Sequence, residues 1–211
     1  MDAADNLAFF RARHVAFVRI LDQRRADAVM PAALLAEAFD CFDGALESRC
    51  ASAPPVACGK GCSTCCTVRV TATAPEVLLM ARHLREVCAP DVCVRLVQRI
   101  AQADNDTRHV DEESRVAMRR PCPFIGDDGA CVVYPVRPLA CRGHASHDRN
   151  ACVQAASGLI DRIPLSVAHR TVRSLVQNAM QSALRDAGYA WASYELNHAL
   201  RLALADPGTD A

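Results

Sequence analysis

The residues of this chain that could do chemistry are cysteines, and seven of the twelve lie in two short segments. The first segment holds four, spaced C-x3-C-x2-C-C, and the second holds three beside a glycine-flanked turn and two prolines. Thiols packed this closely cannot all pair as disulfides without strain, but they can all face one cation. Because thiolates repel one another, a cluster of them needs a positive centre. The predicted metal ligands are Cys58, Cys62, Cys65, Cys66, Cys122, Cys131 and Cys141.

The number of thiols leaves the stoichiometry of this site open. Seven exceed the four that one zinc ion or one cubane iron–sulfur cluster needs, and they fall one short of two four-thiolate sites. Adjacent Cys65 and Cys66 cannot easily bind the same single ion, because the peptide between them would have to twist. The pattern therefore favours a polynuclear site with shared thiolates, or an eighth ligand from His144, His147 or Cys152. A position left open to water or substrate would make the site catalytic.

The remaining residues that could act as ligands have simpler interpretations. Cys41 and Cys50 have no partner thiol at ligand spacing, and we interpret them as small hydrophobic residues in or near the core. Cys88 and Cys93 could be distant ligands, but we interpret them as packed, neutral thiols. Glu76 lies three residues after Thr73, which is the spacing of a capping box at a helix start, so we assign it a capping role rather than a metal-binding one.

Composition excludes several function classes. Acidic and basic side chains balance at 24 each, so no basic excess is present to neutralise nucleic-acid phosphates. No stretch approaches the length of a membrane-spanning helix, and the first residues do not have the pattern of a secretory signal. Clustered thiols without an export signal are typical of a reducing compartment, and we expect a cytoplasmic protein with neither a nucleic-acid nor a membrane partner.

Apolar periodicity predicts a mainly α fold, a helical bundle with an irregular cysteine-rich metal-binding insert and a short β-hairpin or knuckle. We expect one domain over 1–211, whose cysteine-cluster core occupies about 55–145 between flanking helices. A break at 51–55 leads into the first cysteine segment. Helices are expected over 3–29, 32–49, 73–87, from 90 to a turn or loop at 103–109, from 164 to 186, and over 191–205 before Pro207 and Gly208, with a short strand at 67–71.

The second cysteine segment is predicted to deliver its ligands from irregular structure. The turn signal Gly-Asp-Asp-Gly at 126–129 predicts a knuckle that places Cys122 and Cys131 on neighbouring short strands. Pro135 and Pro138 then disfavour a regular strand or helix as far as Cys141. A bound metal would hold such a loop in place.

Three motifs carry a resemblance to a known family. They are Cys58-x3-Cys62-x2-Cys65-Cys66, Cys122-Pro-Phe-Ile with Cys131-Val-Val-Tyr134, and Arg137-Pro-Leu-Ala-Cys141-Arg142. Together they resemble the CxxCxxCC family of YkgJ-like cysteine-cluster proteins, a domain described as zinc- or iron-chelating. The resemblance covers about 55–145, and the first spacing is x3 where the family has x2. It implies bound zinc or iron, with an iron–sulfur cluster as one form, but no defined biochemical role.

Three functions follow from these observations. The first is a metal-binding protein in which zinc or an iron–sulfur cluster serves metal handling, redox sensing or structure. The second is an iron–sulfur enzyme related to flagellin lysine N-methylases, which the resemblance implies because these longer proteins are relatives of the family. The third is a zinc-stabilised module that binds a protein partner. Whether the chain is an enzyme, which substrate or partner it takes and its oligomeric state stay open.

Overall fold

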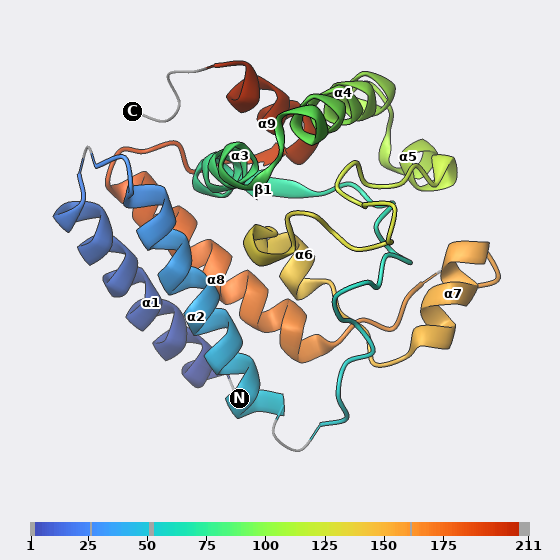
Figure 1. Ribbon diagram of the computed structural model, residues 1–211. Coiled ribbons are helices and arrows are strands. Elements are labelled where there is room, and N and C mark those ends of the chain that lie inside the picture. The colour runs from blue at the N-terminus through green and yellow to red at the C-terminus, as the bar shows by residue number, and fades with distance from the viewer. Residues whose placement is uncertain (1–2, 26, 51–52, 161, 207–211) are drawn as a thin grey trace.

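The computed structural model describes residues 3–25, 27–50, 53–160 and 162–206. The fold is mainly α, as predicted, with a two-stranded antiparallel sheet. Figure 1 shows two groups of helices, and the segments that carry the cysteines run between them. Each group is built around its own cluster of buried apolar side chains.

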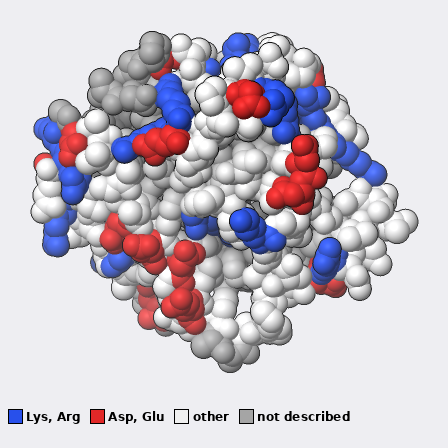
Figure 2. Space-filling model, in the orientation of Figure 1, with Lys and Arg blue, Asp and Glu red and all other residues white. Residues whose placement is uncertain are grey.

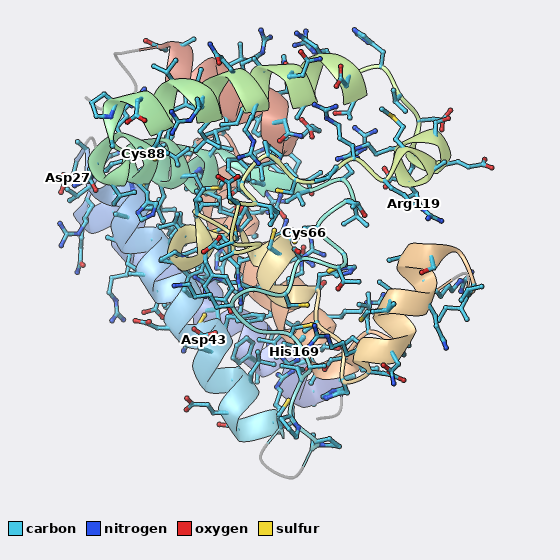
Figure 3. The ribbon with its side chains drawn as sticks, turned by 45° about the vertical axis from the view of Figure 1, so that its right-hand side comes forward. Asp27, Asp43, Cys66, Cys88, Arg119 and His169 are labelled. Carbon is cyan, nitrogen blue, oxygen red and sulfur yellow. The ribbon has the colours of Figure 1, made fainter. Side chains whose placement is uncertain are left out.

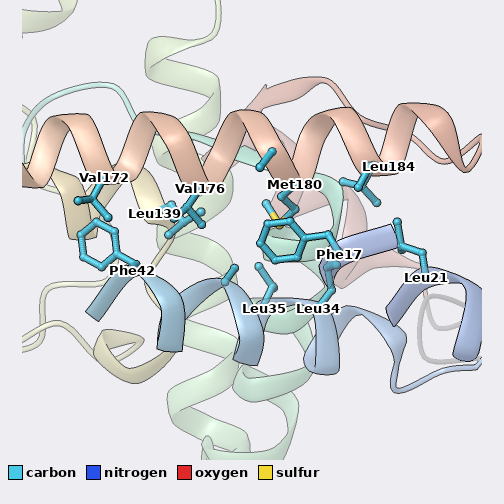
Figure 4. Close-up of a cluster of buried hydrophobic side chains, with 13 residues drawn as sticks. Phe17, Leu21, Leu34, Leu35, Phe42, Leu139, Val172, Val176, Met180 and Leu184 are labelled. Atoms are coloured by element: carbon cyan, nitrogen blue, oxygen red, sulfur yellow. The ribbon is translucent and has the colours of Figure 1, made fainter. Parts of the chain in front are cut away.

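The first group consists of three long helices that run side by side (Figure 1). Each has apolar residues at three- and four-residue spacing, which places them on one face of a helix. Figure 4 shows these apolar faces in contact, with Phe17 of the first helix between the other two. The helices are α1 (Ala3–Gln23), α2 (Met30–Cys50) and α8 (Val167–Asp186). Their buried residues include Phe17, Leu21, Leu34, Leu35, Phe42, Val172, Val176, Met180 and Leu184.

The second group packs at the other side of the cysteine segments. It contains α3 (Ala74–Val87), α4 (Pro90–Thr107) and α9 (Leu196–Ala205). Met80, Ile100 and Leu200 are fully buried between these helices. Within the described ranges, no helix is long and apolar enough to span a lipid bilayer.

The small sheet anchors the chain just after the first cysteine segment. Strand β1 (Thr71–Thr73) pairs antiparallel with β2 (Ser193–Glu195), in the register Ala72 opposite Tyr194. The backbone N–H of Leu196 adds a hydrogen bond to the carbonyl of Val70 at 3.0 Å. The exit of the first cysteine segment is therefore fixed to the connection between α8 and α9.

Several predicted boundaries are wrong, and local hydrogen bonds explain the differences. Helix α1 ends at Gln23 rather than 29, because Asp27 turns the chain by accepting from the N–H of Val29 at 3.0 Å. The predicted strand 67–71 shares only Thr71 with β1. The predicted last helix begins at Leu196 rather than 191, because 193–195 form β2. Pro207, Gly208 and the start of the predicted break at 51–55 lie outside the described residues.

A turn or loop was predicted for the polar stretch 103–109. This prediction is wrong as far as Thr107, because α4 continues to that residue. Its side chains pair within the helix, since the Gln102 amide donates to Asp106 at 2.7 Å and the Thr107 hydroxyl to the carbonyl of Ala103 at 2.7 Å. Two short helices outside the cysteine segments were not predicted, and the residue before each is an aspartate that caps it. They are α5 (Glu112–Met118) after Asp111 and α7 (Arg149–Ser157) after Asp148.

A buried carboxylate joins α4 to α9. The Asp104 side chain is fully buried, and its Oδ2 lies 2.6 Å from Nε of Arg201 and 3.3 Å from Nδ1 of His198, both on α9. Arg108 donates to Oδ1 at 3.1 Å. Burial alone would raise the pKa of Asp104, but the hydrogen bonds from Arg108 and His198 lower it overall. The carboxylate is therefore charged and holds three cationic or polar side chains in place.

We expect Asp104→Asn to lower the free energy of unfolding by about 2 kcal/mol, because the surrounding cations lose a buried counter-charge. Since folding lowers the Asp104 pKa, the deficit should shrink as the pH falls through that pKa. Asp91→Asn on the same helix removes an exposed pair with Arg95, which water screens, and should change stability far less. Urea denaturation of both variants checks this, and equal effects would contradict the bridging role.

Candidate metal centre

The seven predicted cysteines all line one cavity of about 200 Å³. It lies between the two helix groups, and residues of both contribute to its wall, such as Phe42 of α2 and Met80 of α3. Figure 3 shows Cys66 in the middle of the molecule, with Asp43 and His169 on the side of the first group. Two cysteine segments that are far apart in the sequence thus share one enclosed space.

The first cysteine segment is held by tight turns and by the loop that follows helix α6 (Leu139–Gly143). The N–H of Cys62 donates to the carbonyl of Gly59 at 3.1 Å, and Gly61 has a φ of 92°, a left-handed conformation that favours glycine. At the start of the segment, the Cys58 Sγ accepts from the backbone N–H of Ser146 at 3.3 Å. The N–H of Ala57 donates to the Ser146 carbonyl at 2.8 Å. These hydrogen bonds hold Cys58 next to Ser146, in the loop that follows Cys141.

A direct backbone hydrogen bond joins the two cysteine segments. The N–H of Cys122 donates to the carbonyl of Cys66 at 2.7 Å. This bond connects the last thiol-bearing residue of the first segment to the first one of the second. This hydrogen bond holds the end of the first segment next to the start of the second.

The predicted knuckle is present between Cys122 and Cys131. Gly126 donates to the carbonyl of Ala130 at 2.8 Å, and the bridge between Ile125 and Cys131 closes a short hairpin. Two apolar side chains fix it in the second core, because Phe124 and Val133 are each 1% exposed. On its outer side, Arg99 of α4 donates to the Ile125 carbonyl at 2.6 Å.

Cys141 does not lie in an irregular loop, as predicted, but in the short helix α6 (Leu139–Gly143). After the 3₁₀ turn η1 (Tyr134–Val136), Pro138 occupies the position before the first helical residue, where its missing N–H is not needed. Leu139 is fully buried in the first core. The guanidinium of Arg142 donates to the carbonyls of Pro135 and Arg137, at 2.7 and 3.2 Å. These contacts hold α6 in addition to the metal that is predicted to hold this segment.

Glu76 caps two helices at once. One carboxylate oxygen accepts from the N–H and the hydroxyl of Thr73, at 2.7 and 2.8 Å, which completes the predicted capping box of α3. The other oxygen accepts from the N–H of Leu139, the first residue of α6, at 2.8 Å. The side chain is buried, at 2% exposure. Glu76 therefore ties the helix after the first cysteine segment to the helix that carries Cys141.

Several thiols of the cavity have raised pKa values, which favours their neutral form. Burial raises the pKa of Cys141 to about 12 and that of Cys122 to about 11. A hydrogen bond with Cys66 is the main cause that raises the pKa of Cys65 to about 12. The Arg137 guanidinium, which also lines the cavity, lowers the pKa of Cys131, but burial outweighs it. Only a stronger positive charge within the cavity would ionise several of these thiols together.

The candidates for an eighth ligand differ in position. His144 lines the cavity and hydrogen-bonds Cys65, and its Nε2 is buried with no partner among the described residues. His147 instead lies with Nδ1 3.3 Å from the carbonyl oxygen of Pro55, and Cys152 is buried in α7 near Cys58. Neither of these two lines the cavity. The structure therefore favours His144.

Sequence reasoning missed His169, which also lines the cavity. It comes from the first turn of α8, where its Nδ1 lies 2.9 Å from the Ser166 hydroxyl. Burial lowers the pKa of His169, which favours the neutral imidazole that a metal binds. No spacing relates His169 to the cysteines, so only the packing of α8 against the cavity reveals it.

The side chains of the cavity are chemically suited to bind a soft metal, but they are not arranged around one common point. Seven thiols and two imidazoles are the donors that zinc and iron–sulfur sites use. Among the described residues, however, no group of three or more His, Cys, Asp or Glu side chains is arranged to hold one ion as it stands. The thiols of Cys58 and Cys65 instead hydrogen-bond Ser146 and Cys66. Metal binding therefore requires these thiols to turn toward a common centre.

The other cysteines lie outside this cavity, as interpreted from the sequence. Cys41 packs against the first core, and burial raises its pKa to about 12. Cys50 ends α2 and is partly exposed. Cys88 packs against the second core, and burial raises its pKa.

Comparison with known proteins adds one match. Residues 57–158 match the model of the CxxCxxCC family, described as a "putative zinc- or iron-chelating domain". The matched range contains all seven cysteines of the cavity. Searches of curated proteins and of solved structures found no match to the chain.

We expect Glu76→Gln to lower the free energy of unfolding by about 2 kcal/mol, because one of its two acceptor positions becomes an amide that faces an N–H group. It should also loosen α6 and increase the alkylation rate of Cys141 in metal-free protein. Glu86→Gln, on the same helix, removes an exposed pair with Arg82 and serves as the control. Denaturation and timed alkylation measure the two effects. An unchanged Cys141 rate in Glu76→Gln would refute the double cap.

Proposed function

We propose that residues 57–158, which match the model of the CxxCxxCC family, bind zinc or iron through the thiolates of the seven cysteines that line the cavity. The observation that carries this proposal is the convergence of both cysteine segments on one enclosed space. Packing apolar side chains alone gives no reason to gather seven thiols there, because neutral thiols are small hydrophobic groups that can sit anywhere in a core.

The position of the cavity supports an accessory role, in which the metal serves handling, redox sensing or structure. The cavity lies between two helix groups, so an ion bound to thiolates from both segments would cross-link them. The first segment presents Cys58, Cys62, Cys65 and Cys66 beside His144, and the second presents Cys122, Cys131 and Cys141. We therefore propose a polynuclear site with His144 as the further ligand. The ion supplies the positive charge that lets the thiols ionise.

A second cavity favours catalysis as the alternative function. It has a volume of about 780 Å³ and shares Cys65 and His144 with the cysteine cavity. Its walls are largely apolar, with Val68, Val116 and Ile163 among them. This is large enough for an organic substrate, which could then approach the metal from the Cys65 side. The enzyme considered from the sequence, an iron–sulfur protein methylase, would use such a cleft.

We expect anaerobically purified protein to contain zinc or iron. Replacement of one thiol in either cysteine segment should reduce the metal content. Cys62→Ser and Cys141→Ser should each lose at least about half of the bound metal, because each removes a thiolate ligand. Cys41→Ser, which lies outside the cavity, should retain all of it. Metal analysis gives the content, and visible absorption distinguishes an iron–sulfur cluster from colourless zinc. Unchanged content in both cavity variants would refute the shared site.

The methylase alternative predicts transfer of label from S-adenosylmethionine to protein. Wild-type protein and Cys62→Ser would be incubated with the labelled cofactor and cell extract. Label in an extract protein with the wild type but not with the variant would support catalysis. An unlabelled extract, in the presence of fully metal-loaded protein, would count against it.

A further inference from the structure

The second cavity lies between α5 and α7, and we call it the α5–α7 cavity. It has a volume of about 780 Å³, and the first cysteine segment and the start of α8 complete its wall. Three of its lining residues are arginines from three different segments, Arg119 after α5, Arg162 before α8 and Arg170 in α8. No aspartate or glutamate of the described residues lines it. The cavity therefore has an excess of positive charge.

Ion pairs do not compensate the charge of these three arginines. No carboxylate in the part of the chain that the structure describes pairs with any of them, whereas the neighbouring Arg120 pairs with Asp106 of α4. Asp161, which lies outside the described residues, carries one negative charge, so the arginines keep an excess of at least two positive charges. All three arginines are exposed, so a ligand that enters from solution can reach their guanidinium groups.

Arg119 has a backbone conformation that favours glycine. It follows α5 with a φ of 47°, and no other non-glycine residue within the described ranges has a positive φ. Figure 3 shows Arg119 at the end of α5, on the side of α7. Its guanidinium reaches the end of α7, because a Cβ on Gly158 would lie only 2.9 Å from Nη2 of Arg119. The lack of a side chain at Gly158 thus leaves room for this guanidinium at the cavity wall.

The rest of the cavity wall is mostly apolar. Val116 of α5 is 52% exposed, which is unusual for a large apolar side chain unless a ligand or partner covers it. The apolar lining residues are Val68, Val116, Ala117, Ala155, Ala156, Ile160, Ile163 and Leu165. An inorganic anion would leave this wall in contact with water, whereas an organic anion with an apolar body would cover it.

The charge of the cavity also distinguishes between possible substrates of the catalytic alternative. The substrate of a lysine methylase carries a cationic side chain, and uncompensated arginines repel a cation. The same arginines attract a carboxylate or phosphate group, because a guanidinium can donate two parallel N–H groups to such an oxyanion. The cavity therefore favours an anionic substrate over a lysine side chain.

We propose that the α5–α7 cavity binds an organic anion. Arg119, Arg162 and Arg170 hold its carboxylate or phosphate group, and its apolar body lies along the apolar wall. Cys65 and His144 line this cavity as well as the cysteine cavity, so the anion lies beside residues that are proposed to bind the metal. The inference deepens the catalytic alternative by naming its substrate class, and it rests on the proposed function where it places the anion beside a metal.

Calorimetric titration with octanoate, octyl phosphate, octanol and octylamine tests this proposal, because the four probes share one chain and differ in charge. Metal-loaded protein should bind at least one of the two anions, with one molecule per chain and about tenfold more tightly than octanol. Octylamine should not bind. Added salt should weaken binding of the anion but not of octanol. The anion that binds more tightly shows whether the site is built for a carboxylate or a phosphate.

Arginine variants locate the binding site. Arg119→Gln and Arg170→Gln should each weaken binding of the anion by about tenfold, because each removes a charged donor, and should leave binding of octanol unchanged. Arg95→Gln replaces an exposed arginine of α4 and should keep wild-type affinity. Thermal unfolding of each variant confirms that it is folded.

The proposal is overturned if neither anion binds, if octanol or octylamine binds as tightly as the anions, or if both cavity variants keep wild-type affinity. Metal content, measured on the same samples, separates this result from the metal proposal, because the three arginines do not line the cysteine cavity. Anion binding by protein that holds no metal would support the anion site and count against the metal site. Retained metal without anion binding would overturn the anion site alone.

Discussion

The main physical constraint on this structure is the charge state of seven thiols that line one cavity. As neutral groups they are compatible with the packing, and burial favours the neutral form of two of them by raising the pKa of Cys122 to about 11 and that of Cys141 to about 12. As thiolates they would repel one another strongly in a medium of low dielectric constant. Only a cation among them changes this balance, because it converts the mutual repulsion into shared attraction. The protein thus folds its thiols into a place where their ionisation and metal binding must occur together.

The two helix groups make this cavity by ordinary apolar packing. Leu139 places α6 in the first core, while Phe124 and Val133 place the knuckle in the second. Glu76 then joins the two by capping α3 and α6 with one buried carboxylate. The cysteine segments contribute little regular structure, and their positions follow from these anchors and from the bond between Cys66 and Cys122. On the face that Figure 2 shows, basic and acidic side chains lie in scattered groups among uncharged residues.

Much of this could be predicted from the sequence, and the exceptions share one cause. Helices with long apolar stripes, the capping box at Thr73 and the turn at 126–129 were predicted because local spacing determines them. The clustering of all seven cysteines followed from their charge chemistry. Helix α6, the second bond of Glu76 and the placement of His169 could not be predicted, because each depends on a contact between segments that are distant in the chain. Strand β2 was missed for the same reason, since three residues form a strand only beside β1.

Residue-resolved protection of thiols by metal tests the central claim most directly. Protein with and without zinc or iron would be alkylated briefly, digested, and each cysteine peptide quantified. Because the claim is that both segments share one centre, metal should slow alkylation of cysteines in 58–66 and of Cys122, Cys131 and Cys141 together, and leave Cys50 unchanged. Protection confined to one segment, or equal alkylation of every cavity thiol with and without metal, would contradict the account.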